Sequence, residues 1–307
     1  MRLLFLFLDG VGLGGNDPAA NPLARAEMPY LQNLLGGRKL LRESAPYHGE
    51  RAELLSLDAG LGVGGLPQSA TGQASLLTGK NAPGEIGYHY GPKPDPLVTE
   101  FLSNGTIFSL LKKKEKKVAL LNAYPPGYFE GIESGHRLYS AVPLAVTKAG
   151  IRLKDQEDLF AGRALSADFT GRGWREHLKI PGSPVYDPYL AGVKLAELAM
   201  DLDFAFFEYW LSDYAGHKRD MQAALEILST IDGVIGGLAS VWRYEEGLVL
   251  LTSDHGNMED ISTRRHTSNP VPAVILGNAD LRKSFTTELR DIRDAGKKIL
   301  QLFDALP

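Results

Sequence analysis

Cysteine is absent from this chain of 307 residues. Its absence excludes disulfide bonds, thiolate metal sites and a cysteine nucleophile, and it is compatible with a reducing compartment. An excess of positive charge is missing too, because 33 basic residues face 37 acidic ones and the net charge is −4. Binding to a nucleic-acid backbone needs clustered positive charge, so no nucleic-acid partner is expected. A small anionic ligand remains possible, since bound metal ions supply positive charge locally.

Long apolar runs are also missing. The run Leu3–Leu8 has six residues and ends at Asp9. It is too short for a signal peptide and lacks a cleavage site, so it predicts a buried first strand. No run approaches the roughly 18 apolar residues of a membrane span. We therefore expect a cytoplasmic protein without a membrane partner, and the sequence leaves its oligomeric state open.

Strand-like and helix-like patterns alternate along the chain, which indicates an α/β fold. The strand runs are continuously apolar, as in a parallel sheet covered on both faces. We expect a single domain over 1–307, a three-layer sandwich with a mostly parallel sheet between helices. The expected strands are 2–8, 54–58, 117–122, 203–210, 247–253 and 271–276. The expected helices are 27–36, 69–79, 105–115, 187–201, 219–242 and 286–304.

Residues 124–186 differ from the rest of the chain. They are rich in Gly, Pro and Tyr, and their periodicity is weak. We interpret them as an insertion or lid over one edge of the sheet, with short helices at 141–149, 155–163 and 171–178.

Carboxylates and imidazoles follow three of the expected strands. One more imidazole lies in the loop after the third of these strands. In open α/β sheets, ligands bind beyond the carboxyl ends of the strands. Each group taken alone also fits a helix cap, a tight turn or a surface position. Their joint occurrence instead predicts a site for two divalent ions, which in phosphoryl-transfer enzymes lie about 4 Å apart. The six residues are Asp9, Asp213, His217, Asp254, His255 and His266.

A candidate nucleophile, Ser69, follows the glycine-rich segment 60–67 and begins an expected helix. A helix start offers backbone N–H groups to an anion. Ser69 could equally be an N-cap residue. A nearby metal ion would ease loss of its proton and make it a nucleophile. Thr71 is the rival nucleophile.

The order of these residues resembles the alkaline phosphatase superfamily, and most closely its branch of cofactor-independent phosphoglycerate mutases and phosphopentomutases. Asp254-His255-Gly256-Asn257 and the segment His266–Pro272 are similar to that branch. The spacing from Ser69 to Gly79 matches as well, and it favours Ser69 over Thr71 as the nucleophile. The resemblance covers about 1–123 and 187–280.

The resemblance implies two divalent ions, Mn or Zn, and a small phosphorylated substrate. Ser69 would bridge or adjoin the ions and would attack phosphorus, forming a phosphoserine. One ion would be held by Asp213, His217 and His266, and the other by Asp254, His255 and Asp9.

Two departures from the mutases affect the expected reaction. The mutases have Gly-His where this chain has Gly72-Gln73. They also carry a large cap domain, whereas this chain has only 124–186. A mutase must retain its phosphorylated intermediate in a closed site, so the sequence favours a hydrolase acting on a small phosphate ester. A phosphomutase is the alternative, and a non-catalytic, metal-stabilised binding protein is an alternative of another class. A sulfatase is disfavoured, because the Pro and Arg that follow its modified residue are absent after Ser69.

Five further residues are candidates for substrate contacts. Two arginines precede His266 and could clamp an anionic group, although solvated loop arginines are equally common. The others lie on or after the expected nucleophile helix, where packing and turn roles are the alternatives. These candidates are Thr71, Gln73, His89, Arg264 and Arg265.

Overall fold

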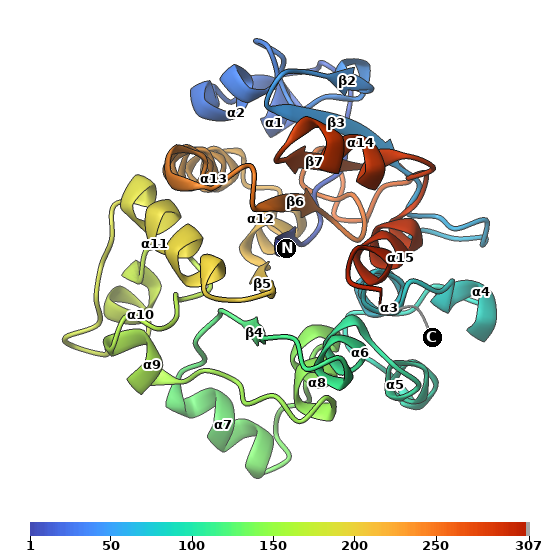
Figure 1. The fold of residues 1–307 in the computed structure, drawn as a ribbon. Helices are drawn as coiled ribbons and strands as arrows, with labels where there is room; N and C mark the ends of the chain where they lie inside the picture. The colour runs from blue at the N-terminus through green and yellow to red at the C-terminus, as the bar shows by residue number, and fades with distance from the viewer. Residues whose placement is uncertain (305–307) are drawn as a thin grey trace.

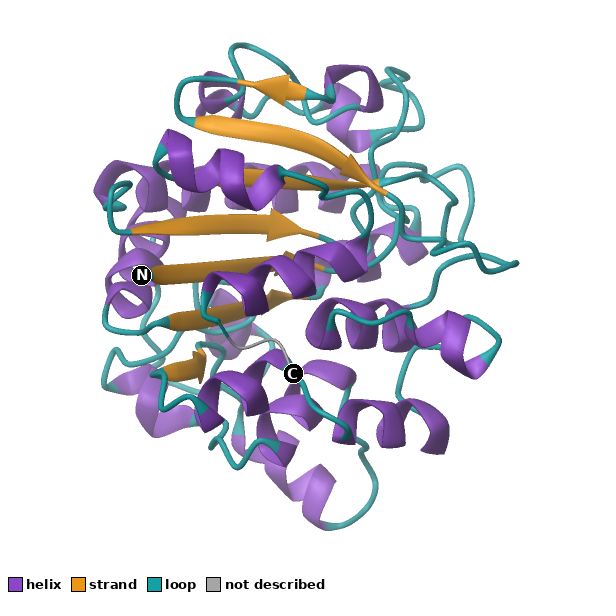
Figure 2. Ribbon diagram, turned by 45° about the vertical axis from the view of Figure 1, so that its right-hand side comes forward, coloured by secondary structure: helices purple, strands orange, loops and turns teal. Residues whose placement is uncertain are grey.

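A computed structural model describes residues 1–304, which form one seven-stranded sheet with helices on both faces (Figures 1 and 2). The strand order is β2-β3-β7-β6-β1-β5-β4. The α/β fold expected from the sequence is confirmed, and each of the six expected strands is present. The short β2 was not predicted. The strands are β1 (Arg2–Leu8), β2 (Tyr47–His48), β3 (Ala52–Leu57), β4 (Val118–Leu120), β5 (Phe204–Tyr209), β6 (Gly247–Thr252) and β7 (Val271–Leu276).

The centre of the sheet is parallel, and this arrangement positions the site. Strands β6, β1, β5 and β4 run in one direction, whereas β7 is antiparallel to both β6 and β3. Phe7 pairs with Glu208 on one side and with Thr252 on the other. Because the three central strands end at the same level, the residues that follow them meet at one edge.

One face of the sheet is covered by helices whose side chains form a core with Phe5, Phe7 and Phe206. Apolar residues of α3, α5, α6, α7, α8, α14 and α15 enter this core. These helices are α3 (Ser69–Thr78), α5 (Pro96–Ser103), α6 (Ile107–Lys113), α7 (Pro126–Glu133), α8 (Ala141–Lys148), α14 (Ala279–Thr286) and α15 (Ile292–Leu302).

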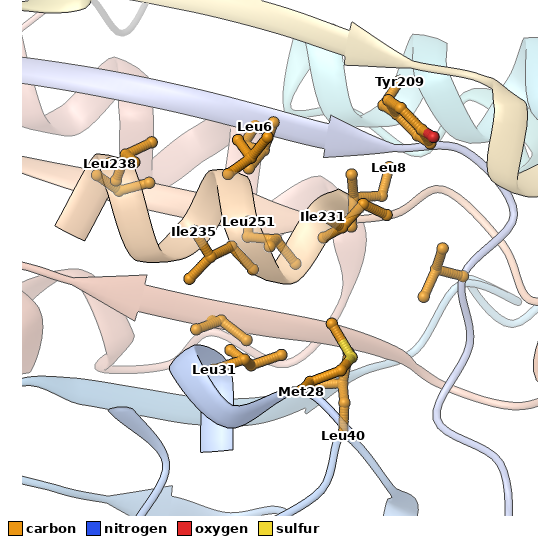
Figure 3. Packing of buried hydrophobic residues seen from close by; sticks show 14 of the residues in the cluster. Leu6, Leu8, Met28, Leu31, Leu40, Tyr209, Ile231, Ile235, Leu238 and Leu251 are labelled. Carbon is orange, nitrogen blue, oxygen red and sulfur yellow. The ribbon is translucent and has the colours of Figure 1, made fainter. Parts of the chain in front are cut away.

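The opposite face packs against a second core that contains Leu6, Leu8 and Leu251 (Figure 3). Its helices are α1 (Pro22–Arg25), α2 (Pro29–Leu34), α11 (Pro188–Met200), α12 (Leu211–Lys218) and α13 (Met221–Val241). The buried carboxylate of Asp232 on α13 accepts hydrogen bonds from the backbone of Tyr30 and Leu31. These bonds satisfy free N–H groups at the start of α2 and fix it on α13.

The helix α13 modifies one expectation from the sequence. By length and composition it is apolar enough to cross a membrane, although no such run was expected. Half of the apolar stretch of α13 that could span a membrane is buried inside the protein. There, Ile231, Ile235 and Leu238 pack toward the sheet (Figure 3). Burial of this kind is typical of a core helix, which can match a membrane span in length and apolar composition.

The bounds of the expected helices lie within six residues of those observed, and six of the helices in residues 1–304 were not predicted, namely α1, α4 (Ala82–Ile86), α5, α7, α12 and α14. The range 286–304 contains α15, but the preceding residues form the separate helix α14. Within 124–186, the three expected short helices correspond to α8, α9 (Gln156–Phe160) and α10 (Arg172–Glu176), whereas α7 was not predicted. The remaining helix of the nucleophile region is α4, and a 3-10 turn lies at Arg42–Ser44.

The segment 124–186 is packed into the body of the protein beside β4 (Figure 1). Asn122 forms a bridge with Leu165, and Ala123 with Lys154. Phe169 stacks on the ring of Phe207 at a centroid distance of 4.5 Å. Since α7 and α8 enter one core and Phe169 the other, this segment extends both hydrophobic layers beyond the last strand.

Candidate metal centre

The site lies where β1, β5 and β6 end. Asp9 directly follows β1, and Asp213 lies on α12 after β5. Asp254 and His255 follow β6, whereas His266 comes from the loop before β7. Two groups of side chains have ligand atoms within 4.8 Å of one another. We call them the outer group (Asp213, His217 and His266) and the inner group (Asp9, Asp213 and His255).

The turn after β1 brings the two groups together. Gly10 has a positive φ of 68°, which favours glycine. A Cβ atom at Gly10 would lie 2.5 Å from Asp213 Oδ1. The missing side chain therefore lets the β1 turn approach the start of α12, so that Asp9 and Asp213 share one site.

The outer group is partly open to solvent. His217 Nε2 lies 3.3 Å from Asp213 Oδ2 and 3.2 Å from His266 Nε2. His266 Nε2 lies 3.8 Å from Asp213 Oδ1. The side chain of His217 is 43% exposed, whereas that of His266 is 7% exposed.

Main-chain carbonyls fix the orientation of both outer imidazoles. His217 Nδ1 donates to Arg264 O at 2.8 Å, and His266 Nδ1 donates to Pro67 O at 2.8 Å. With Nδ1 protonated, each neutral ring presents the lone pair of its Nε2 to the other. Two lone pairs at 3.2 Å repel unless a proton or a cation lies between them. The same use of the second ring nitrogen is typical of metal-binding histidines.

The inner group is buried. His255 is fully buried, and its Nε2 lies 3.3 Å from Asp9 Oδ1. Within residues 1–304, Asp9 Oδ1 has no hydrogen-bond partner. A buried carboxylate oxygen that is paired with an imidazole but accepts no hydrogen bond is only partly satisfied, and coordination to a cation would satisfy it. The donors of both groups, oxygen and imidazole nitrogen, also fit Mn or Zn.

The role of Asp254 as a ligand of the inner ion stays a prediction. Asp254 belongs to neither group, and the inner group contains Asp213 instead. Its Oδ2 accepts a hydrogen bond from Gln73 Nε2 at 3.1 Å and lies 3.7 Å from His255 Nε2. Its Oδ1 lies 3.4 Å from Gly10 N. Asp254 thus lies beside the inner group and connects it to α3.

Charge and burial give the two groups different protonation states. Burial disfavours the charged form of Asp213, but hydrogen bonds from His217 and Asn257 outweigh burial and lower its pKa to about 2. Burial and the neighbouring charge of His255 lower the pKa of His266 to about 4. Burial also opposes a charged His255, yet Asp254 and Asp9 raise its pKa to about 10. Burial and Asp254 raise the pKa of Asp9.

Ser69 lies against the inner group. It is the first residue of α3, it is 5% exposed, and its Oγ lies 3.0 Å from His255 Nε2. The helix can come this close because residue 72 is glycine. A Cβ atom there would lie 2.9 Å from Asp254 O. Ser69 therefore places a hydroxyl group at the amino end of a buried ten-residue helix and beside the ligand cluster.

Parts of this chain are similar to known proteins. Residues 189–304 match the family model of the Metalloenzyme superfamily. A 2,3-bisphosphoglycerate-independent phosphoglycerate mutase of Natronomonas pharaonis is 33% identical over 113 residues, which are 33% of this chain and 22% of the mutase. The mutase of Yersinia pestis is 24% identical over 215 residues, 64% of this chain and 40% of its own length. The resemblance to the alkaline phosphatase superfamily is confirmed.

Two solved structures share the fold of this chain. The PH0037 protein of Pyrococcus horikoshii has a TM-score of 0.59 at 16% identity, covering 100% of this chain and 97% of that one. The alkaline phosphatase of the Antarctic bacterium TAB5 has a TM-score of 0.52 at 12% identity, covering 100% and 98%. At these identities the likeness concerns the fold alone. The chain spans between about a fifth and two fifths of the curated mutases named above.

The residues that were expected to contact a substrate lie in different parts of the structure. Thr71 is fully buried and its hydroxyl bonds to the backbone of Gln68 and Tyr90, so it anchors a loop. Gln73 donates to Asp254, while within residues 1–304 its Oε1 has no partner. His89 lies outside both groups, beside the glycine-rich segment 60–65. Burial lowers its pKa.

The two arginines before His266 are exposed. The contact of Arg264 with the site runs through its main chain, because its carbonyl oxygen accepts from His217 Nδ1. Within residues 1–304, the hydrogen bonds of Arg264 and Arg265 are made by their main chains, and no ion pair joins either guanidinium group to the ligands. A role for either in binding an anion therefore remains a prediction.

Three supporting residues were not predicted as part of the site, although the first two lie within the motif that begins at Asp254. Asn257 donates to Asp213 Oδ1 at 2.6 Å. Glu259 accepts from the backbone of Gly12 and Asn257 and from Asn269 Nδ2, at 2.8 to 3.0 Å. Ser253 Oγ accepts from Val11 N at 2.9 Å. Together they join the loops after β1 and β6. Their position directly around Asp254-His255 in the sequence could have indicated that they belong to the site.

Proposed function

We propose that this protein is a phosphoryl-transfer enzyme with two divalent ions, and that it hydrolyses a small phosphate ester through a phosphoserine at Ser69. The observation that carries the proposal is the position of the Ser69 hydroxyl, 3.0 Å from His255 in a cluster of carboxylates and imidazoles. Asp9 Oδ1, which is paired with His255 but accepts no hydrogen bond within residues 1–304, supports a cation in the same place.

The outer ion would be held by Asp213, His217 and His266. The inner ion would be held by Asp9 and His255, with a further carboxylate from Asp213 or Asp254. When bound, the ions supply positive charge for the phosphoryl oxygens and for the serine alkoxide. Mn and Zn both suit these donors, and availability often decides between them.

The chain's own residues would position the reacting groups. The backbone at the start of α3 fixes Ser69, and Thr71 holds the loop at Tyr90 against the same helix. The Ser69 Oγ–P bond would form as the P–O bond to the leaving group breaks. Water would then break the phosphoserine bond, releasing phosphate and restoring the serine hydroxyl.

A phosphomutase is the second candidate, because the curated relatives named above are phosphoglycerate mutases. Hydrolysis is preferred, since only 124–186 stands where those enzymes carry a cap. In this chain that segment also packs into both cores beside β4. A mutase would have to keep its intermediate from water with these residues alone.

The test uses metal-stripped protein with Mn or Zn restored, and Ser69→Ala under the same conditions. Both p-nitrophenyl phosphate and bis-p-nitrophenyl phosphate are assayed. We expect release of p-nitrophenol that depends on the metal and is lost in the variant, while the metal content of the variant is unchanged. The preferred ester distinguishes a monoesterase from a diesterase.

Two other outcomes would change the proposal. Full activity of Ser69→Ala would exclude the phosphoserine mechanism. No release from either ester, with two ions confirmed by elemental analysis, would favour a selective mutase or a non-catalytic binding protein. Isomerisation of phosphoglycerate and of sugar phosphates would then separate these two.

A further inference from the structure

Two large aromatic side chains are exposed on the helix that carries the outer ligands. Trp210 is the N-cap residue of α12 and is 46% exposed, and Tyr214 is 53% exposed. Asp213 and His217 belong to the same helix. Neither aromatic residue is part of a hydrophobic core in the described chain.

Helical spacing places both aromatics on the face of α12 that carries His217. Trp210, Tyr214 and His217 are spaced i, i+4 and i+7, and residues with this spacing share one helix face. Trp210 already has a helical backbone conformation, with φ −98° and ψ −7°. Because His217 is itself 43% exposed, the open side of the outer group continues into this aromatic surface.

Tyr214 also lies under a cation. Lys218 Nζ is 4.3 Å from the centre of the Tyr214 ring. The surface therefore combines two π faces with one positive charge, a combination that suits planar groups and anions rather than aliphatic ones. An exposed Trp–Tyr pair beside a reactive centre is also costly to leave in water, and a planar ligand would cover it.

We propose that Trp210 and Tyr214 stack against a planar ring in the leaving group, so that the preferred substrates are phosphate monoesters of nucleosides or similar ring-bearing alcohols. The inference rests on the proposed function, since Ser69 and the two ligand groups would hold the phosphoryl end. The remainder of the ester then extends past His217, over the aromatic face of α12.

The test compares two esters that share the same phosphorylated carbon. A purine nucleoside 5′-monophosphate carries a base, whereas ribose 5-phosphate lacks it. We expect kcat/KM of the wild-type protein to favour the nucleotide by about 5- to 100-fold, the range of one base–aromatic stacking contact. Trp210→Ala and Tyr214→Ala should each reduce this preference, mainly through KM, and Trp210→Phe should restore most of it.

The matched control is Tyr30→Ala. Tyr30 is exposed to the same degree, 46%, but lies on α2 and packs against Tyr189 of α11. The control should leave the ratio of the two kcat/KM values unchanged, as should any variant that merely loosens the fold.

The outcomes separate this inference from the proposed function. Equal kcat/KM for both esters, or an unchanged ratio in Trp210→Ala, would overturn the stacking role while leaving phosphate hydrolysis intact. A change of oligomeric state in Trp210→Ala without a change in the ratio would assign the surface to a protein contact and also overturn it. If neither ester nor p-nitrophenyl phosphate is hydrolysed, the proposed function itself fails.

Discussion

The two ligand groups share Asp213 but differ in almost everything else. The outer imidazoles are held by main-chain carbonyls, and one of them is open to solvent. The inner group is buried beside Ser69, and His255 faces carboxylates on two sides. The outer site is therefore built to exchange a ligand with solvent, whereas the inner site is built to keep one.

Protonation follows the same division. The low pKa values of Asp213, about 2, and His266, about 4, leave both in the form that binds a cation at neutral pH, whereas the hydrogen bond with Asp213 raises the pKa of the third outer ligand, His217. The pKa of His255, about 10, and the raised pKa of Asp9 mean that the inner group holds protons where an ion would bind. A metal entering the inner group must displace them.

The largest effect is expected from Asp213→Ala, because this carboxylate belongs to both groups. We expect loss of both ions and a fall in phosphatase activity of several orders of magnitude. His217→Ala should remove the outer ion alone. Elemental analysis of the purified variants gives the metal content. Retention of two ions by Asp213→Ala would show that the groups do not share a ligand.

The next largest effect is expected in the pH dependence of metal affinity, which should differ between the two groups. Below pH 10, His255 carries a proton that the inner ion must displace, so its affinity should rise by about tenfold per pH unit. The outer affinity should change less, since Asp213 and His266 are already deprotonated at pH 6 to 8. In the outer group His217 also has a proton to lose, because its hydrogen bond with Asp213 raises its pKa above 6.5. Calorimetry in buffers of different ionisation enthalpy measures the protons released. Equal release from both groups would contradict the division.

The same proton affects the metal-free fold. The folded-state pKa of His255 lies above its ordinary value of 6.5. Its contribution to stability is therefore complete below pH 6.5 and is lost as the pH rises toward 10. Metal-free protein should become less stable over this window, and thermal unfolding at a series of pH values would record it.

Supporting residues should differ in which ions they affect. Asn257 donates to Asp213, whereas Gln73 donates to Asp254 beside the inner group. Loss of a hydrogen bond that orients a metal ligand typically reduces metal affinity by about 10- to 100-fold. Because Asp213 belongs to both groups, we expect Asn257→Ala to weaken both ions, whereas Gln73→Ala should weaken only the inner one, as measured by metal titration. Identical titrations for the two variants would remove the distinction.

The smallest effect is expected from Arg264→Ala. His217 uses the carbonyl oxygen of Arg264, which the substitution retains. Outer-ion affinity should therefore stay within about twofold of the wild type, as for other exposed positions. A fall in kcat/KM with unchanged metal affinity would assign the guanidinium group to substrate binding, and a fall in metal affinity would contradict the main-chain role.

The sequence was sufficient for the sheet and for most of the cluster, for a physical reason. Continuous apolar runs mark buried strands, and polar residues directly after parallel strands meet at one edge. Asp9, Asp213 and Asp254 could be placed by this rule alone. The sharing of Asp213 between both groups could not, because it depends on the close approach of the β1 turn at Gly10.

Other features depend on contacts that no local pattern contains. The hydroxyl of Thr71 is occupied by the backbone of Tyr90, 19 residues away. Glu259 accepts hydrogen bonds from Gly12 in the loop after β1 and from Asn257 and Asn269 in the loop after β6, and its neighbours in sequence do not indicate these donors. Helix α7 was not predicted because its eight residues, Pro126–Glu133, include two glycines and only one buried side chain, Tyr128.

The missing side chain at Gly72 has a consequence for the reaction itself. With 2.9 Å between an added Cβ atom and Asp254 O, even one methyl group would force α3 and the β6 loop apart. The clearance at this residue thus sets how far the hydroxyl of Ser69 stands from the inner ligands. A series of Gly72→Ala, Gly72→Ser and Gly72→Val would act as a graded spacer, each step widening the gap that the phosphorus atom must bridge.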